Sequence, residues 1–289
     1  SIWSSWADKI ATSRNISVKT LNEMLDNLEL NFPSDFLDKG LVDKILTREG
    51  LQQQLCDLYS AEKFEDIKTI QFPEYVKAKS AVSNKADQKV AVIYAEGNIV
   101  DGDENQQVAG DRFAGIIEDV RKDSTVKAVV LRVNSPGGSV LASEKIRNEI
   151  SLLKKRGIPV IASYGDYAAS GGYWISSSSD YIFADPTTLT GSIGVFGTVP
   201  NLEGFMTDKI GLSFDVVKTN ENSDFGSIVK PMTPYQLKMM QKHVTDTYDD
   251  FLTLVSTERN LRKTFVDSIA QGRGWSGVDA IEIGLIDEF

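Results

Sequence analysis

Residues 127–140 read KAVVLRVNSPGGSV, and a second stretch of similar design, PVIASYGDYAASGGYW, follows at residues 159–174. Each stretch begins with an apolar run rich in β-branched residues, which predicts a buried strand, and continues into a segment rich in glycine and serine. A helical pattern at residues 139–156 separates the two strands. Because strands that alternate with helices need crossover connections, the sequence predicts a largely parallel sheet.

The same alternation extends from Lys89 to Phe289, so the predicted fold class is α/β. The predicted strands lie at residues 90–97, 127–133, 159–164, 181–184 and 213–217. The predicted helices lie at residues 111–122, 139–156, 170–178, 202–210, 234–258 and 277–283.

The first eighty residues follow a different pattern, because their apolar residues recur at helical spacing. Ser17 precedes Val18, Leu21, Leu25 and Leu28, an arrangement typical of an N-cap and an amphipathic helix. Thr47 is the expected N-cap of a second helix, and residues 72–88 have the composition of a partly helical linker. We therefore predict a helical part at residues 1–80 and an α/β unit at residues 81–289.

A weak internal repeat relates the two parts, with a separation of about 244 residues. The pair Arg14-Asn15 matches Arg259-Asn260. Two interpretations fit: two similar helical hairpins that arose by chance, or the tail of a truncated first repeat unit followed by a complete second unit. The second interpretation, with a start at Ser1 inside a helical pattern, suggests a fragment of a longer protein. The matching segments are IATSRNISVKTLNEMLDNL (10–28) with LVSTERNLRKTFVDSIAQG (254–272), and FLDKGLVDKI (36–45) with AIEIGLIDEF (280–289).

Composition excludes several classes of protein. Apolar residues make up 41% and charged residues 25%, which is typical of a globular protein. The formal net charge of −10 would repel nucleic acid, and no lysine or arginine cluster offsets it. Cys56 and His243 are the only cysteine and histidine, which excludes an internal disulfide and argues against a zinc site. No apolar run approaches the roughly 18 residues that a membrane-spanning helix needs.

The segment Asn134-Ser135-Pro136-Gly137-Gly138-Ser139 is the first candidate site. Pro136 fixes its own φ angle and the two glycines permit a sharp turn, which leaves backbone amides free at the end of a strand. Such amides can bind an oxyanion or a phosphate. A plain tight turn with a capping serine would explain the same residues.

Ser170 is the second candidate, because it follows a predicted strand and precedes a predicted helix among small residues. An N-cap serine is the alternative. Parallel strands end at the same edge of a sheet, so both turns should meet there and supply a nucleophile and an oxyanion hole. A base is missing: His243 lies in a predicted helix with a packed or surface role, which leaves a lysine as the common option.

These residues resemble the signal peptide peptidase A family, also known as protease IV. The motifs are VLRVNSPGGSV, ASGGYWIS, LTGSIGVFG (189–197) and KPMTP (230–234). The resemblance implies a crotonase-like fold of β-β-α units and a Ser-Lys dyad endopeptidase. It implies Ser170 as nucleophile, Gly138 and Gly171 as oxyanion-hole residues, and no cofactor, metal or nucleotide.

The resemblance also implies a ring-shaped homo-oligomer that degrades cleaved signal peptides and other unfolded apolar peptides at the bacterial inner membrane, facing the periplasm. The internal repeat matches the family's long, two-unit form. In that form the upstream N-terminal unit carries the base lysine, and here Ser223 stands where the short form has it, with Lys218 and Lys230 out of register. The base, and any membrane anchor, would therefore lie outside this chain.

Two rival functions remain at this stage. A crotonase-type acyl-CoA enzyme would use the same oxyanion geometry on a thioester, and it would need affinity for coenzyme A. A non-catalytic scaffold would bind peptides or assemble rings without a reactive serine.

Overall fold

The computed structural model describes residues 2–80 and 86–289. It divides the chain into two compact units, a helical unit at Ile2–Asp87 and an α/β unit at Gln88–Phe289. The predicted boundary falls between residues 80 and 81. Residues 81–85, on its far side, lie outside the described residues. Each unit has its own local structure and is considered separately.

The α/β unit is built on a sheet that, within the described residues, has six strands in the order β1-β4-β5-β7-β8, with β6 also paired to β5. All neighbouring strands run parallel except β8, which is antiparallel to β7. The predicted α/β class and parallel sheet are therefore confirmed. The strands are β1 (Lys89–Glu96), β4 (Val126–Ser135), β5 (Val160–Ala169), β6 (Tyr181–Phe183), β7 (Leu189–Gly191) and β8 (Gly274–Ser276), and a separate pair is formed by β2 (Ile99–Val100) and β3 (Val108–Ala109).

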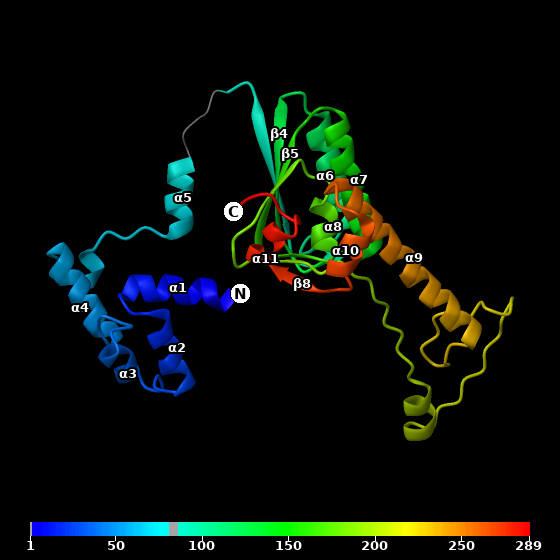
Figure 1. Cartoon of the computed structure of the whole chain (residues 1–289), viewed down its shortest axis with the longest axis horizontal. Helices are drawn as coiled ribbons and strands as arrows, with labels where there is room; N and C mark the ends of the chain where they lie inside the picture. Colours follow the sequence, from blue (N-terminus) through cyan, green and yellow to red (C-terminus); the bar gives the residue numbers. More distant parts are fainter. Residues whose placement is uncertain (1, 81–85) are drawn as a thin grey trace. The chain divides into compact units, whose positions relative to one another are not determined.

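Helices cover one side of this sheet, as Figure 1 shows for α6 to α10 beside β4 and β5. Strand residues that point toward the helices, such as Leu131 and Val133, are fully buried, whereas Val92 and Tyr94 on the other face of β1 are exposed. This alternation is what a sheet covered on one face requires. The helices are α6 (Gly110–Lys122), α7 (Val140–Lys155), α8 (Gly171–Ser176), α9 (Pro234–Glu258), α10 (Lys263–Ile269) and α11 (Gly277–Glu282).

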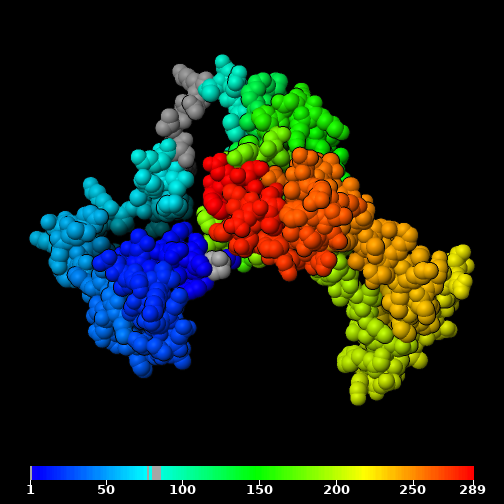
Figure 2. All heavy atoms as spheres, viewed as in Figure 1, coloured from blue at the N-terminus to red at the C-terminus, as the bar shows by residue number. Residues whose placement is uncertain are grey.

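The largest difference from the predicted elements lies between β7 and α9. The predicted strand at residues 213–217 is wrong, because residues 211–218, all described, form no strand. Val217 is 97% exposed and pairs with no neighbouring strand there, so its β propensity is not used. The predicted helix at 202–210 is present as a short helical segment, α-helical at residues 203–204 and continued by a wider helical turn at Phe205–Lys209. In Figure 2 this segment and the start of α9, coloured yellow-green to gold, project from the rest of the α/β unit.

The helical unit consists of short helices with side-chain caps where the sequence predicts them. Ser17 Oγ accepts from the Thr20 amide at 2.9 Å, and Thr47 Oγ1 accepts from the Gly50 amide at 3.1 Å. Nowhere in the described residues is a helix both long and apolar enough to cross a bilayer. The elements are α1 (Ile2–Arg14), α2 (Val18–Asp26), α3 (Pro33–Asp38), α4 (Arg48–Tyr59), η1 (Phe64–Asp66) and α5 (Phe72–Ser80).

The two segments related by the sequence repeat share backbone geometry. Asn15 and Asn260 each end a helix in the left-handed region, with φ of 53° and 52°. Gly40 and Gly284 do the same at 72° and 77°. The recurring bonds are Ile16 N to Ala11 O with Leu261 N to Ser256 O, and Leu41 N to Phe36 O with Leu285 N to Ala280 O.

An ion pair closes both segments in the same way. Arg14 bonds Asp43 at 3.0 Å, and Arg259 bonds Asp287 through two nitrogens at 3.0 and 2.7 Å. The surroundings differ, because the side chain of Arg259 is 9% exposed and that of Arg14 is 30% exposed. The same local structure is thus mostly buried in the α/β unit and more exposed to solvent in the helical unit.

Candidate active site

Ser170 lies between the end of β5 and the start of α8, in a backbone conformation that few residues other than glycine adopt. Its φ and ψ angles are 53° and −119°. Its amide donates to the Gly191 carbonyl and its carbonyl accepts from the Trp174 amide, both at 2.9 Å. Although Ser170 occupies the N-cap position of α8, its side chain makes no capping hydrogen bond within the described part of the chain. Ser170 therefore has the N-cap position that the alternative expected, but its hydroxyl does not act as a cap and is left for another use.

Gly138 lies in the other turn, which follows β4, and is tied to β2 by backbone bonds. Ile99 N donates to Gly137 O at 2.9 Å, and Ser139 N donates to Ile99 O at 2.8 Å. These bonds occupy one edge of the turn, so the Gly138 amide points to the opposite edge. The Gly137 amide donates to the buried Ser135 Oγ at 3.2 Å.

The two turns are in direct backbone contact. A Cβ atom placed on Gly137 would lie 2.6 Å from the Gly171 nitrogen and 2.8 Å from Ser170 Cβ. A Cβ on Gly171 would lie 3.1 Å from the Gly138 nitrogen. Neither the Gly138 nor the Gly171 amide donates to an acceptor among the described residues. The structure thus brings the three predicted residues together, with two unpaired N–H groups beside one hydroxyl.

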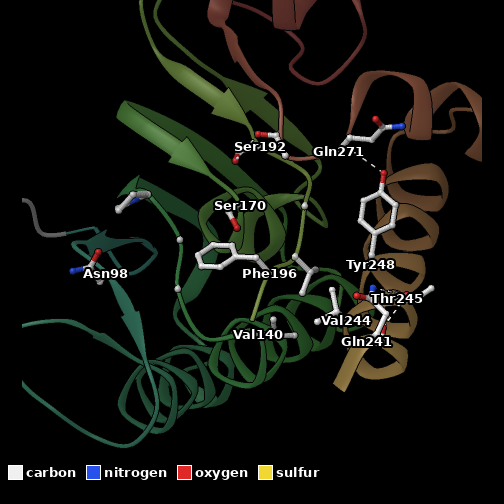
Figure 3. Close-up of a pocket in the computed structure, with 16 residues that line it drawn as sticks. Asn98, Val140, Ser170, Ser192, Phe196, Gln241, Val244, Thr245, Tyr248 and Gln271 are labelled. Carbon is white, nitrogen blue, oxygen red and sulfur yellow. Dashed lines mark hydrogen bonds between the residues drawn. The ribbon is translucent and has the colours of Figure 1, made fainter. Parts of the chain in front are cut away.

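A pocket of about 870 Å³ opens beside Ser170. As Figure 3 shows, the side chain of Ser170 faces this space, and a stripe of side chains from α9 forms the opposite wall. None of the described residues that line the pocket carries a charge at neutral pH. The lining residues include Pro136, Val140, Val195, Phe196, Gln241, Val244, Thr245 and Tyr248. An uncharged, mainly apolar wall suits an apolar ligand.

No base for Ser170 is found in the pocket wall among the residues described. Lys218 donates to the Glu221 carbonyl at 3.0 Å and to Asp224 Oδ2 at 3.1 Å, and this hydrogen bond lowers the pKa of Asp224. Lys218 and Lys230 both line a second, separate cavity of about 260 Å³. His243 is exposed on α9 and does not line the Ser170 pocket.

Residues 152–289, which contain Ser170 and Gly171, match the description "Peptidase family S49". The chain belongs to the signal peptide peptidase A family, peptidase family S49. Gly138 precedes the matched residues, so the match covers one of the two turns.

Three relatives extend the similarity of this S49 chain to its full length. "Protease 4" of Haemophilus influenzae is 40% identical over 300 residues, covering 99% of this chain and 48% of the relative. "Protease 4" of Salmonella typhi is 38% identical over 297 residues, covering 99% and 47%. "Serine protease SPPA, chloroplastic" of Arabidopsis thaliana is 29% identical over 295 residues, covering 99% and 43%. The chain spans about half the length of these relatives.

The structure adds residues to the S49 site that the sequence did not single out. Ser192, with φ of 47°, lines the pocket from the segment that follows β7. Tyr248 and Gln271 enter from α9 and from the turn before β8. The glycine and serine of LTGSIG were the available signal for Ser192. Tyr248 stands in an ordinary helical pattern, which carries no such signal.

Proposed function

We propose that this chain carries the nucleophile of a Ser-Lys dyad endopeptidase. The observation that supports this most is the strained backbone of Ser170, whose hydroxyl makes no capping hydrogen bond and lies beside two unpaired amides. The name of the Arabidopsis relative, which includes "serine protease", agrees with a serine nucleophile. The proposed substrates are cleaved signal peptides and other unfolded apolar peptides, and the proposed location is the bacterial inner membrane, facing the periplasm.

In the proposed mechanism, Ser170 Oγ attacks the scissile carbonyl carbon while a lysine takes the hydroxyl proton. The carbonyl oxygen becomes an oxyanion that accepts hydrogen bonds from the Gly138 and Gly171 amides. The lysine then protonates the leaving amine as the C–N bond breaks, which leaves an acyl-serine. Water, deprotonated by the same lysine, attacks the carbonyl carbon of this ester, and the lysine returns the proton to Ser170 Oγ as the C–Oγ bond breaks, which releases the second peptide product.

A bound peptide would lie extended along residues 194–196. Gly194, Val195 and Phe196 line the pocket, and Phe196 is 88% exposed. Backbone groups of an open strand-like segment can pair with an extended peptide, while side-chain pockets select alternate residues. The uncharged α9 wall favours apolar side chains over charged ones, since an unpaired charge loses hydration there.

The base lysine would come from an upstream unit outside this chain. We infer that the helical unit is the tail of a first repeat, because its turns and ion pair reproduce those at the end of the α/β unit. The relatives that match the full chain are about twice as long, which leaves room for such a unit. The finer assignment to a crotonase-like fold rests on the same family resemblance.

A ring-shaped homo-oligomer remains part of the proposal. The segment that projects between β7 and α9 exposes large apolar residues, among them Phe205 at 57% and Ile210 at 51%, and Leu237 at the start of α9 is 54% exposed. Exposed apolar residues gathered on one segment are typical of an assembly surface.

The rival functions fit the site less well. Coenzyme A carries phosphates, whereas the described lining of the Ser170 pocket has no cationic side chain. A non-catalytic scaffold gives no reason for a strained serine without a capping bond.

The proposal is tested on the full-length protein with its upstream unit. Wild type should cleave an unfolded apolar peptide and react with a fluorophosphonate at Ser170, and Ser170→Ala should do neither. The present chain alone should cleave at most slowly. Equal cleavage by wild type and Ser170→Ala would exclude Ser170 as the nucleophile, and robust cleavage by the isolated chain would exclude an external base.

A further inference from the structure

Tyr248 joins three elements, of which α9 and the turn at 271–273 line the pocket. Its hydroxyl donates to Asp267 Oδ1 on α10 at 2.7 Å and accepts from the Gln271 amide at 3.2 Å. Figure 3 shows the ring standing on α9 beside the pocket, with its hydroxyl directed to Gln271. The single proton of the hydroxyl and one of its two lone pairs are therefore used within the protein.

The turn at residues 271–273, which Tyr248 contacts, has a strained backbone and few hydrogen bonds within itself. Gln271 and Gly272 have φ angles of 57° and 76°, and the first of these is strained for a residue with a Cβ atom. The only other bond that closes this turn in the described backbone runs from Arg273 N to Ala270 O, at 3.1 Å. Removing the tyrosine hydroxyl would leave the Gln271 amide without its acceptor.

The same turn fixes the segment along which the proposed peptide lies. Gly272 N donates to Ile193 O at 2.9 Å, and Ser192 N donates to Arg273 O at 2.8 Å. A Cβ on Gly194 would lie 2.7 Å from Gly272 Cα, so the two segments are in backbone contact. A shift of residues 271–273 therefore moves residues 192–194 with it.

Ser170 itself is attached to a different part of this structure. Its amide bonds Gly191, and Gly191 belongs to the β7–β8 ladder, where it is paired with Gly274. That ladder remains when the Tyr248 hydroxyl is removed. The peptide wall and the nucleophile thus have separable supports.

We propose that Tyr248 is a positioning residue for substrate, which sets the peptide wall at residues 192–196 through the turn at 271–273. The inference rests on the proposed peptidase function and deepens it. Burial and the hydrogen bond to Asp267 raise the pKa of Tyr248 to about 12, so the hydroxyl stays protonated at neutral pH and keeps its bond to Asp267.

The test compares Tyr248→Phe with wild type in the full-length protein, using an apolar reporter peptide. We expect KM to rise about tenfold, the loss typical of a misplaced hydrogen-bonding wall, with kcat changed less than about twofold. The rate of fluorophosphonate labelling of Ser170 should stay unchanged, because a small reagent does not use the wall. Tyr181→Phe is the matched control, since it removes a hydroxyl bonded to Glu288 at 3.0 Å outside the pocket and should leave KM unchanged.

Asp267 provides a second set of variants in case Tyr248→Phe folds poorly. Asp267→Ala should raise KM as much as Tyr248→Phe does. The double variant should have the same KM as either single variant, because both changes break the same hydrogen bond. Asp267→Asn keeps an acceptor and should have a KM close to that of wild type. Unchanged KM in both Tyr248→Phe and Asp267→Ala overturns the positioning role. An equal loss of kcat and of the rate of Ser170 labelling in Tyr248→Phe also overturns the positioning role. Wild type that labels at Ser170 but cleaves no peptide overturns the proposed function itself, and with it this inference.

Discussion

Ser139 and Ser170 occupy equivalent places in the fold, and the structure uses them in opposite ways. Each follows a parallel strand and stands at the N-cap of the next helix. Ser139 has φ of −58°, accepts from the Ala142 amide at 3.3 Å and donates to Asp101 at 2.6 Å. Ser170 has a positive φ and makes no capping bond within the described residues. The same residue type thus stabilises one turn and strains the other.

The difference shows what marks a reactive serine in this fold. A non-glycine residue in such a backbone region costs about 1–3 kcal/mol, which persists only where the surroundings impose it. Here the Gly191 bond and the fully buried Tyr173, the third residue of α8, hold the turn in place. Strain combined with an unused hydroxyl is therefore a better sign of function than the serine's position in the sequence.

The largest expected effect is on Ser170→Gly. Proteolysis by the full-length protein should fall by roughly 10⁴-fold or more, because the nucleophile is lost. Stability should rise by about 1 kcal/mol, since glycine adopts these angles without strain but loses more entropy on folding. Urea unfolding checks the stability. Ser170→Ala is the matched control, with the same loss of activity and no gain in stability. A destabilised Ser170→Gly would show that the turn is not strained.

Gly138→Ala should have the next largest effect. The new Cβ would overlap the Ile99 carbonyl, so the turn must shift and carry the Gly138 amide away from the oxyanion. Misplacing one such donor should lower kcat by about 10²–10³-fold. Gly157→Ala is the control, because Gly157 also has a positive φ, 78°, but no atom within 4 Å of the added Cβ. It should lower stability and leave kcat unchanged. Equal kcat in the two variants would contradict an oxyanion role for Gly138.

Much of the α/β unit follows from local sequence signals. The predicted helix at 234–258 has the bounds of α9. The predicted helix at 111–122 begins one residue after α6, and the predicted helix at 139–156 is one residue longer than α7 at each end. These elements have strong apolar periodicity or a clear cap, as at Thr233. The three-residue strands β7 and β8 were not predicted, since segments so short have no period. They form because two segments that lie far apart in the sequence pair with each other.

The site divides in the same way. Glycine and serine patterns predicted that Ser170, Gly138 and Gly171 would meet, because parallel strands end at one sheet edge. Their roles in catalysis stay predictions. Residues of the opposite wall, Tyr248 and Gln271, could not be predicted, because the packing of α9 and α10 places them there. The failed strand at 213–217 has the same cause, since its propensity found no partner.

Ser139→Ala should have the smallest effect and should alter stability alone. The variant loses a helix cap, which costs about 1 kcal/mol. The Gly138 amide should keep its place, because the backbone bonds from Ile99 to Gly137 and from Ser139 to Ile99 do not involve the Ser139 side chain. We therefore expect the melting temperature to fall while kcat/KM for the reporter peptide changes less than about threefold. Asp101→Ala removes the partner of the Ser139 hydroxyl but spares the cap, so it should cost less than Ser139→Ala. A large drop in kcat with Ser139→Ala would mean that both serines serve the chemistry, and the contrast between the two turns would be lost.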